Sequence, residues 1–338
     1  MVDRTSRAGP KPIASILGVA LLLIVALGCS DERETSMEPG TSLDFASLRS
    51  DPPRLADEHV VVARDGAELR VRSYGSDAPV DLILVHGSGA FNVYLADLAA
   101  AIADSGAAVV HTPDLRGHGA APERRGDIDY IDQLEDDLAD LIGALATAHP
   151  ERKRVLGGHS SGGGLAIRFA GGPHAAAVDG HLLLAPFLQH DAPTTRPNSG
   201  GWASPRLGRI IGLTLLNALG IRALNSITVL DFDLPVERRS GRETPAYSFR
   251  MMAGINPRDF RSDLAALRVP TLVIVGSDDE AFVAERFPEV FAAHAPDAEV
   301  VIVPGAGHLA LVTNAEATQL SIDWLRGFAT GEPARRDD

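Results

Sequence analysis

Cysteine is nearly absent from this sequence, because Cys29 is the single one among 338 residues. One cysteine cannot form a disulfide within the chain, so no disulfide framework supports the fold. The fold must rest instead on a hydrophobic core. With 45% hydrophobic and 22% charged residues, the composition is that of an ordinary globular protein with a substantial core. The length allows one large α/β domain or two small ones.

Basic residues are also in deficit. The chain has 31 Lys and Arg against 45 Asp and Glu, which gives a formal net charge of −14 at pH 7. Nucleic-acid binding depends on Lys and Arg that neutralise phosphates, so this balance argues against a nucleic-acid partner. A diffuse acidic surface keeps a protein soluble and needs no further explanation.

A long apolar run is present near the N-terminus, where "IASILGVALLLIVALG" covers residues 13–28 after a start with three basic residues. Sixteen helical residues span about 24 Å, short of the roughly 30 Å hydrocarbon core of a bilayer, so a signal peptide fits better than a membrane span. The sequence "VALGC" that ends at Cys29 resembles a bacterial lipobox, which implies cleavage after residue 28 and lipidation of Cys29. An uncleaved N-terminal anchor is the alternative.

This resemblance predicts a lipid-anchored protein of the bacterial cell envelope, and Ser30 after the cysteine favours, by analogy, the outer membrane or periplasmic face. Several acyl chains anchor a protein stably. Residues 29–57 are acidic, bear Pro and Ser and have no apolar period, so we expect a flexible tether. Residues 331–338 are expected to form a disordered tail.

From residue 58 to about 330 the pattern predicts an α/β fold with a doubly wound, mostly parallel sheet. A hairpin with its turn at Asp65-Gly66 is followed by continuous apolar runs, "VDLILV", "GHLLLAP", "PTLVIVG" and "AEVVIVPG", that alternate with helical stretches. The sequence between two of these strands, about 187–265, is too long for a structureless loop and has apolar stretches of its own. We predict an inserted, mainly helical cap there.

Ser160 lies in the stretch "GGHSSGGG", where Gly158-His159-Ser160-Ser161-Gly162 fits G-x-S-x-G. This pattern forms the strained strand-to-helix turn that exposes a catalytic serine. It is weak by itself, but an apolar strand precedes it and a helix of small residues follows. Ser161 would need glycine at position 159, where His159 stands, so Ser160 is the candidate nucleophile.

A serine needs a base, and the base needs an acid that holds its tautomer. His308 follows the last predicted strand, at the carboxyl end where open α/β sheets build their sites. Asp279 follows the strand "TLVIVG" and is the candidate acid. Asp278 is its immediate rival, and Asp191 is a weaker one. The order Ser160, Asp279, His308 is that of α/β-hydrolases.

The oxyanion of an acyl-transfer intermediate needs two N–H donors. Ser161 begins the helix after the nucleophile, so its backbone N–H is one candidate. The other is the backbone N–H of Ser88 in "HGSG", which directly follows the strand "LILV".

Together, "HGSG", "DLRGHG", "GHSSGG" and "GSDD" with "GAGH" resemble the α/β-hydrolase superfamily, over roughly residues 58–330. They are similar to monoglyceride lipases, lysophospholipases and the related serine-aminopeptidase-like group. In that family the residue after the HG pair supplies an oxyanion N–H, the Asp of G-x-x-D is the acid and the His of G-x-x-H is the base. The resemblance implies these roles for Ser88, Asp279 and His308.

We therefore expect a serine hydrolase that cleaves carboxylic esters, lipid-like or of short to medium acyl length, with no metal and no cofactor. Its expected partners are the small-molecule acyl substrate and a membrane that holds the lipidated N-terminus; the sequence leaves the oligomeric state open. Apolar cap residues, which include Trp202, Phe249, Met251 and Met252, could line an acyl groove or form the core of the cap. A peptidase or amidase, with a cap acid such as Glu237 or Glu243 holding an amino terminus, is one alternative. A non-catalytic binding protein on the same scaffold is another.

Overall fold

A computed structural model describes residues 43–48 and 53–331. The predicted signal peptide, Cys29 and residues 332–338 of the predicted tail lie outside the described residues. Within them, no helix is long and apolar enough to span a bilayer.

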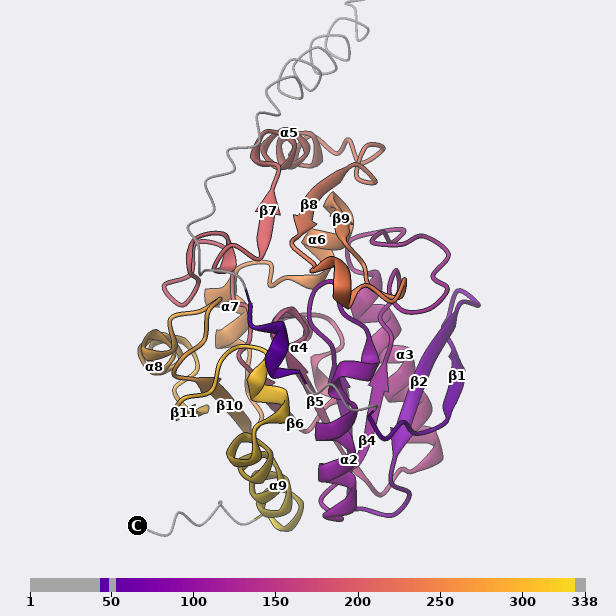
Figure 1. The fold of residues 1–338 in the computed structure, drawn as a ribbon. Helices are drawn as coiled ribbons and strands as arrows, with labels where there is room; N and C mark the ends of the chain where they lie inside the picture. The colour runs from indigo at the N-terminus through magenta and orange to yellow at the C-terminus, as the bar shows by residue number, and fades with distance from the viewer. Residues whose placement is uncertain (1–42, 49–52, 332–338) are drawn as a thin grey trace, which may run out of the picture.

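The central sheet has eight strands in the order β1-β2-β4-β3-β5-β6-β10-β11 (Figure 1). β2 pairs antiparallel with β1 and β4, and every other pairing is parallel. The strands are β1 Glu58–Val62, β2 Glu68–Tyr74, β3 Val80–Val85, β4 Val109–Pro113, β5 Lys153–His159, β6 Gly180–Leu184, β10 Thr271–Gly276 and β11 Glu299–Val303. This arrangement confirms the predicted mostly parallel sheet. The hairpin between β1 and β2 is also confirmed, with Gly66 in the left-handed region at φ 86°.

Helices cover both faces of this sheet (Figure 1). One group consists of α2 and α9, which contact each other, and the other includes α3, α4 and α8. Their bounds are α2 Ala96–Asp104, α3 Gln133–Ala148, α4 Ser161–Ala170, α8 Phe287–His294 and α9 Ala315–Thr330. Because both faces are covered, strands β3, β4, β6 and β10 are buried along their whole length, which explains why their sequences are mainly apolar and do not alternate with polar residues.

The register of the parallel strands sets which loops are neighbours at the carboxyl edge. Val85 at the end of β3 pairs with Gly158 near the end of β5, so the "HGSG" loop lies beside the turn at Ser160. Gly276 at the end of β10 pairs with Val303 at the end of β11, so the loops that carry Asp279 and His308 are adjacent. The fold therefore gathers all the predicted site loops at one edge.

The inserted cap lies above this edge, between β6 and β10 (Figure 1). Its elements are β7 Ala203–Pro205, α5 Leu207–Ala218, β8 Thr228–Phe232, β9 Ala246–Ser248, α6 Phe249–Ile255 and α7 Phe260–Ala265. Helical residues outnumber strand residues, as predicted, but β7, β8 and β9 form an antiparallel sheet that the sequence analysis did not anticipate. These strands are only three to five residues long, too short to show a period of two.

Residues 43–48 depart from the predicted flexible tether. Leu43 is buried, and Phe45 begins a short 3₁₀ helix, Phe45–Ser47. The Phe45 ring lies 5.4 Å from the ring of Trp202 in the cap. The tether prediction is wrong for this segment, because the apolar side chains of "LDFASL" pack on the cap and core, a contact that its acidic surroundings did not indicate.

Candidate active site

The turn between β5 and α4 holds Ser160 in a strained backbone conformation, with φ 57° and ψ −122°. Such a conformation is costly for a residue with a Cβ and is found where function requires it. The flanking glycines are sterically necessary. A Cβ on Gly158 would lie 2.3 Å from the carbonyl carbon of Gly162, and one on Gly162 would lie 2.3 Å from the backbone oxygen of Val85. The structure thus places Ser160 on the sharp turn that the G-x-S-x-G pattern predicts.

Asp279 and His308 form a buried hydrogen-bonded pair. The Nδ1 atom of His308 lies 2.8 Å from Oδ2 of Asp279. Oδ1 of the same carboxylate accepts hydrogen bonds from the backbone N–H groups of Ala281, at 2.8 Å, and Phe282, at 2.7 Å. These bonds fix the carboxylate, which in turn orients the imidazole.

The two rival carboxylates are placed elsewhere. Asp278 is exposed and accepts a hydrogen bond from the Ser277 hydroxyl. Asp191 is also exposed. Of the three acids that the sequence left open, the structure brings Asp279 to His308.

The two predicted oxyanion donors lie next to each other. The Ser88 hydroxyl donates a hydrogen bond to the Ser161 hydroxyl, with the oxygens 2.9 Å apart. Ser161 is the first residue of α4, where backbone N–H groups have no partner within the helix. The side-chain bond therefore ties the "HGSG" loop to the start of the helix.

Two cavities meet at Ser160, one of about 260 Å³ and one of about 1030 Å³. Both are lined by Ser88, Ser160, Trp202 and His308. Ser160 and His308 therefore face common space, although in the described part of the chain no hydrogen bond joins the serine hydroxyl to the imidazole. Such bonds are often long in ligand-free sites and tighten when the substrate binds.

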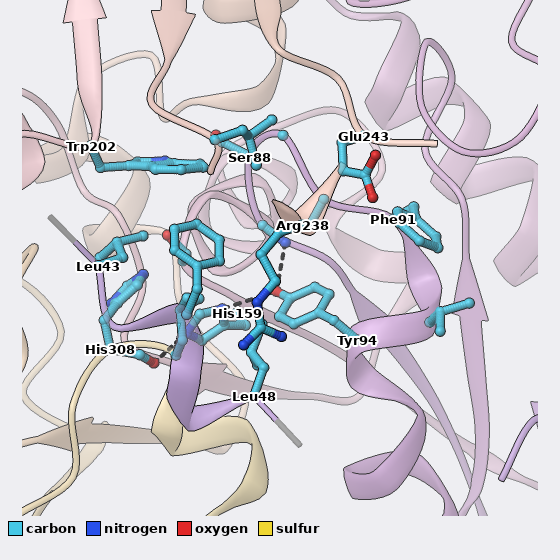
Figure 2. Close-up of a pocket in the computed structure, with 18 of the residues that line it drawn as sticks. Leu43, Leu48, Ser88, Phe91, Tyr94, His159, Trp202, Arg238, Glu243 and His308 are labelled. Carbon is cyan, nitrogen blue, oxygen red and sulfur yellow. Dashed lines mark hydrogen bonds between the residues drawn. The ribbon is translucent and has the colours of Figure 1, made fainter. Parts of the chain in front are cut away.

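The smaller cavity is bordered by the segment 43–48, the loop after β3 and the cap (Figure 2). Its walls are mainly apolar, with Leu43, Phe45, Leu48, Phe91 and Leu234 among them.

The larger cavity runs beneath the cap, where Phe249 and Met252 line it. Met251, by contrast, is fully buried in the core. Phe249 also belongs to the buried hydrophobic cluster of the cap, so the same residue serves both the groove and the core of the cap.

The family described as serine aminopeptidase, S33, matches residues 78–314, well over half of the chain. The chain belongs to this family. Together, the family and the fold of similar solved structures make it an α/β-hydrolase.

Several known proteins are similar to this S33 hydrolase. The dihydrolipoyllysine-residue acetyltransferase component of the acetoin cleaving system of Pseudomonas putida is 26% identical over 276 residues, covering 77% of this chain and 67% of that protein. The solved structure of Paleococcus ferrophilus monoacylglycerol lipase has a TM-score of 0.60 at 20% identity, covering 78% of this chain and all of that one. A thermophilic esterase from Thermogutta terrifontis has a TM-score of 0.55 at 23% identity, covering 81% and 100%.

Sequence reasoning missed two tyrosines at the site of this S33 hydrolase. The hydroxyl of Tyr94 accepts a hydrogen bond from the Gly87 N–H at 2.8 Å, and that of Tyr247 accepts one from the Gly89 N–H at 3.1 Å. Tyr94 follows the "HGSG" motif within the same loop, and tyrosine is scarce, with four in the chain, so its position was a usable signal. Tyr247 gave none, because it reaches the site only through the cap sheet.

Within residues 43–48 and 53–331, no cluster of three or more His, Cys, Asp or Glu side chains is placed to hold a metal ion.

Proposed function

We propose that this hydrolase cleaves carboxylic esters through an acyl-enzyme on Ser160, with His308 as general base and Asp279 as the acid that holds it. The observation that carries the proposal is the buried Asp279–His308 pair facing the same two cavities as the strained Ser160. Hydrolysis through a serine nucleophile uses a base within reach of the serine and an acid that orients the base.

In the proposed reaction, Ser160 Oγ attacks the ester carbonyl carbon while Nε2 of His308 takes the hydroxyl proton. The negative charge that develops on the carbonyl oxygen is held by the backbone N–H groups of Ser88 and Ser161. The bond to the alcohol oxygen then breaks, and His308 returns the proton to the departing alcohol. Water attacks the acyl-enzyme in the same way, which releases the carboxylic acid and restores Ser160.

Esters are favoured as substrates over peptides. The apolar walls of the smaller cavity suit an acyl chain, and similar structures include a monoacylglycerol lipase and an esterase. Glu243, a candidate for holding a peptide amino terminus, lines the smaller cavity. Its carboxylate, however, already accepts hydrogen bonds from the Ser240 N–H and hydroxyl and the Gly241 N–H. Glu237 is exposed and does not line either cavity.

A fluorophosphonate probe tests the nucleophile. The wild-type chain should react and Ser160→Ala should not. Ser161→Ala is the matched control, because it removes a neighbouring hydroxyl but keeps the backbone N–H and should still be labelled. Equal labelling of wild type and Ser160→Ala would refute the role of Ser160. A panel of acyl esters and matching aminoacyl amides then separates an esterase from a peptidase.

We also propose that Cys29 is lipidated after signal cleavage and anchors the enzyme in the bacterial cell envelope. The lipobox-like sequence supports this. Radiolabelled palmitate should be incorporated into wild type and not into Cys29→Ser, and incorporation that persists in the variant would contradict the anchor.

A further inference from the structure

The "HGSG" loop is held on both sides by tyrosine hydroxyls. The hydroxyl of Tyr94, on the segment before α2, accepts a hydrogen bond from the Gly87 N–H. The hydroxyl of Tyr247, on β9 of the cap, accepts one from the Gly89 N–H. The cap makes a second bond to the same place, because the Thr244 N–H donates to the Gly89 carbonyl at 2.9 Å. Both tyrosine contacts therefore fall on the two residues that flank Ser88.

Each tyrosine hydroxyl also forms a hydrogen bond with a buried histidine. The Tyr94 hydroxyl lies 2.9 Å from Nδ1 of His159 (Figure 2), and the Tyr247 hydroxyl lies 2.7 Å from Nε2 of His118. A hydroxyl that accepts from an amide still has one hydrogen to donate, and a histidine nitrogen that carries no proton can accept it.

The other ring nitrogens fit this assignment. Nε2 of His159 donates to the backbone carbonyl of His308 at 3.0 Å, and Nδ1 of His118 donates to the carbonyl of Arg116 at 3.1 Å. Burial holds the pKa of both imidazoles well below the ordinary value, so both are neutral at pH 7.

These two hydrogen bonds leave the backbone N–H of Ser88 available to a ligand. With the N–H groups of Gly87 and Gly89 occupied, the N–H of Ser88 between them has no hydrogen-bond partner in the described part of the chain. Ser88 borders both cavities beside Ser160. Its hydroxyl is also fixed, by the bond to Ser161.

We propose that Tyr94 and Tyr247 are positioning residues that aim the Ser88 N–H at the oxyanion. Because Tyr247 belongs to the cap, the cap helps to position the oxyanion donor as well as covering the site. Through His159, Tyr94 also ties the oxyanion loop to the loop of the base, because His159 binds the His308 carbonyl. This inference rests on the proposed acyl-enzyme mechanism.

The test compares Tyr94→Phe and Tyr247→Phe with Tyr74→Phe. Tyr74 is a buried tyrosine that lines neither cavity, so its variant makes the same chemical change away from the site. Small misplacements of catalytic groups cost up to 100-fold in rate. We expect each site variant to lower kcat about tenfold with KM within twofold of wild type, and Tyr74→Phe to leave both unchanged.

The affinity for a trifluoromethyl ketone inhibitor separates a positioning role from a purely structural one, because a purely structural role would leave this affinity unchanged. It adds to the serine and places a charged oxygen where the oxyanion forms, so its affinity reports the aim of the donors. We expect Tyr94→Phe and Tyr247→Phe to weaken the ketone by the same factor as kcat, at a temperature well below their melting points. If either variant does not fold, His159→Leu and His118→Leu remove the nitrogen that accepts from the tyrosine hydroxyl, and each should change kcat and ketone affinity in the same direction.

Two failures are distinguishable. Active wild type with kcat and ketone affinity unchanged in folded site variants would overturn the positioning role alone. Lower stability with unchanged ketone affinity would also overturn it. A wild-type chain that neither hydrolyses esters nor reacts with fluorophosphonate would overturn the proposed function and this inference together.

Discussion

Asp279→Asn should abolish most activity while leaving the fold intact, because of how the structure fixes its carboxylate. Oδ1 accepts two backbone N–H groups, from Ala281 and Phe282, and Oδ2 faces Nδ1 of His308. In the variant, the amide oxygen must keep the Oδ1 position, since an NH₂ group there would meet two donors. The NH₂ group then faces His308.

The new NH₂ group and the Nδ1–H of His308 are both donors, so they would repel each other unless the imidazole changes its tautomer. With its hydrogen moved to Nε2, His308 can accept from the asparagine but can no longer take a proton from Ser160. Loss of the correct tautomer in such a triad lowers kcat about 10⁴-fold. That factor corresponds to about 5.4 kcal/mol in the activation barrier.

The assay is steady-state hydrolysis of a chromogenic acyl ester, with thermal unfolding as the check on folding. KM should change little, because Asp279 does not touch the cavities. Asp278→Asn, at the exposed neighbouring carboxylate, should retain full activity. A folded Asp279→Asn enzyme with kcat within tenfold of wild type, or an equal loss in Asp278→Asn, would refute the reasoning.

Three further predictions concern the fold around the site. Burial lowers the pKa of His181 to about 4, whereas this imidazole has a pKa near 6.5 in the unfolded chain. The unfolded chain therefore binds the proton first as pH falls, and the free energy of unfolding should drop by about 2 kcal/mol between pH 7.5 and 5. Urea unfolding at both pH values measures this drop, which should be smaller in His181→Asn. Gly162→Ala should cost about 3 kcal/mol or leave the chain insoluble, since its Cβ would meet a strand carbonyl, whereas Gly143→Ala, where a Cβ meets nothing within 4 Å, should fold normally in the same denaturation assay. Phe45→Ala removes the ring packed on Trp202, and should lower stability by about 1 kcal/mol and raise KM for medium-chain esters in steady-state assays.

The arrangement of the candidate site was predictable because its parts are local patterns at strand ends. Each of the residues Ser88, Ser160, Asp279 and His308 follows an apolar run within a few positions. Once the runs are assigned to one parallel sheet, their carboxyl ends must meet at one edge. Which carboxylate contacts His308 needed the structure, because Asp278 and Asp279 are adjacent in sequence and only Asp279 is buried.

The parts that escaped prediction depend on contacts between distant segments. Tyr247 reaches Gly89 across 158 positions, through a strand of three residues with no visible period. Phe45 lies in a segment whose composition indicates a tether, and its packing on Trp202 joins two regions that share no sequence pattern. Both are consequences of how the cap sits on the sheet, which no single stretch of sequence encodes.

The meeting of two cavities at Ser160 has a consequence for which products the enzyme makes. In the proposed mechanism, one cavity can retain the acyl chain after the alcohol has left through the other. The vacated cavity is then open to any acceptor that fits it, so water competes there with other alcohols for the acyl-enzyme. On this mechanism we expect the ratio of free acid to new ester, formed in the presence of an added alcohol, to depend on the shape of the second cavity.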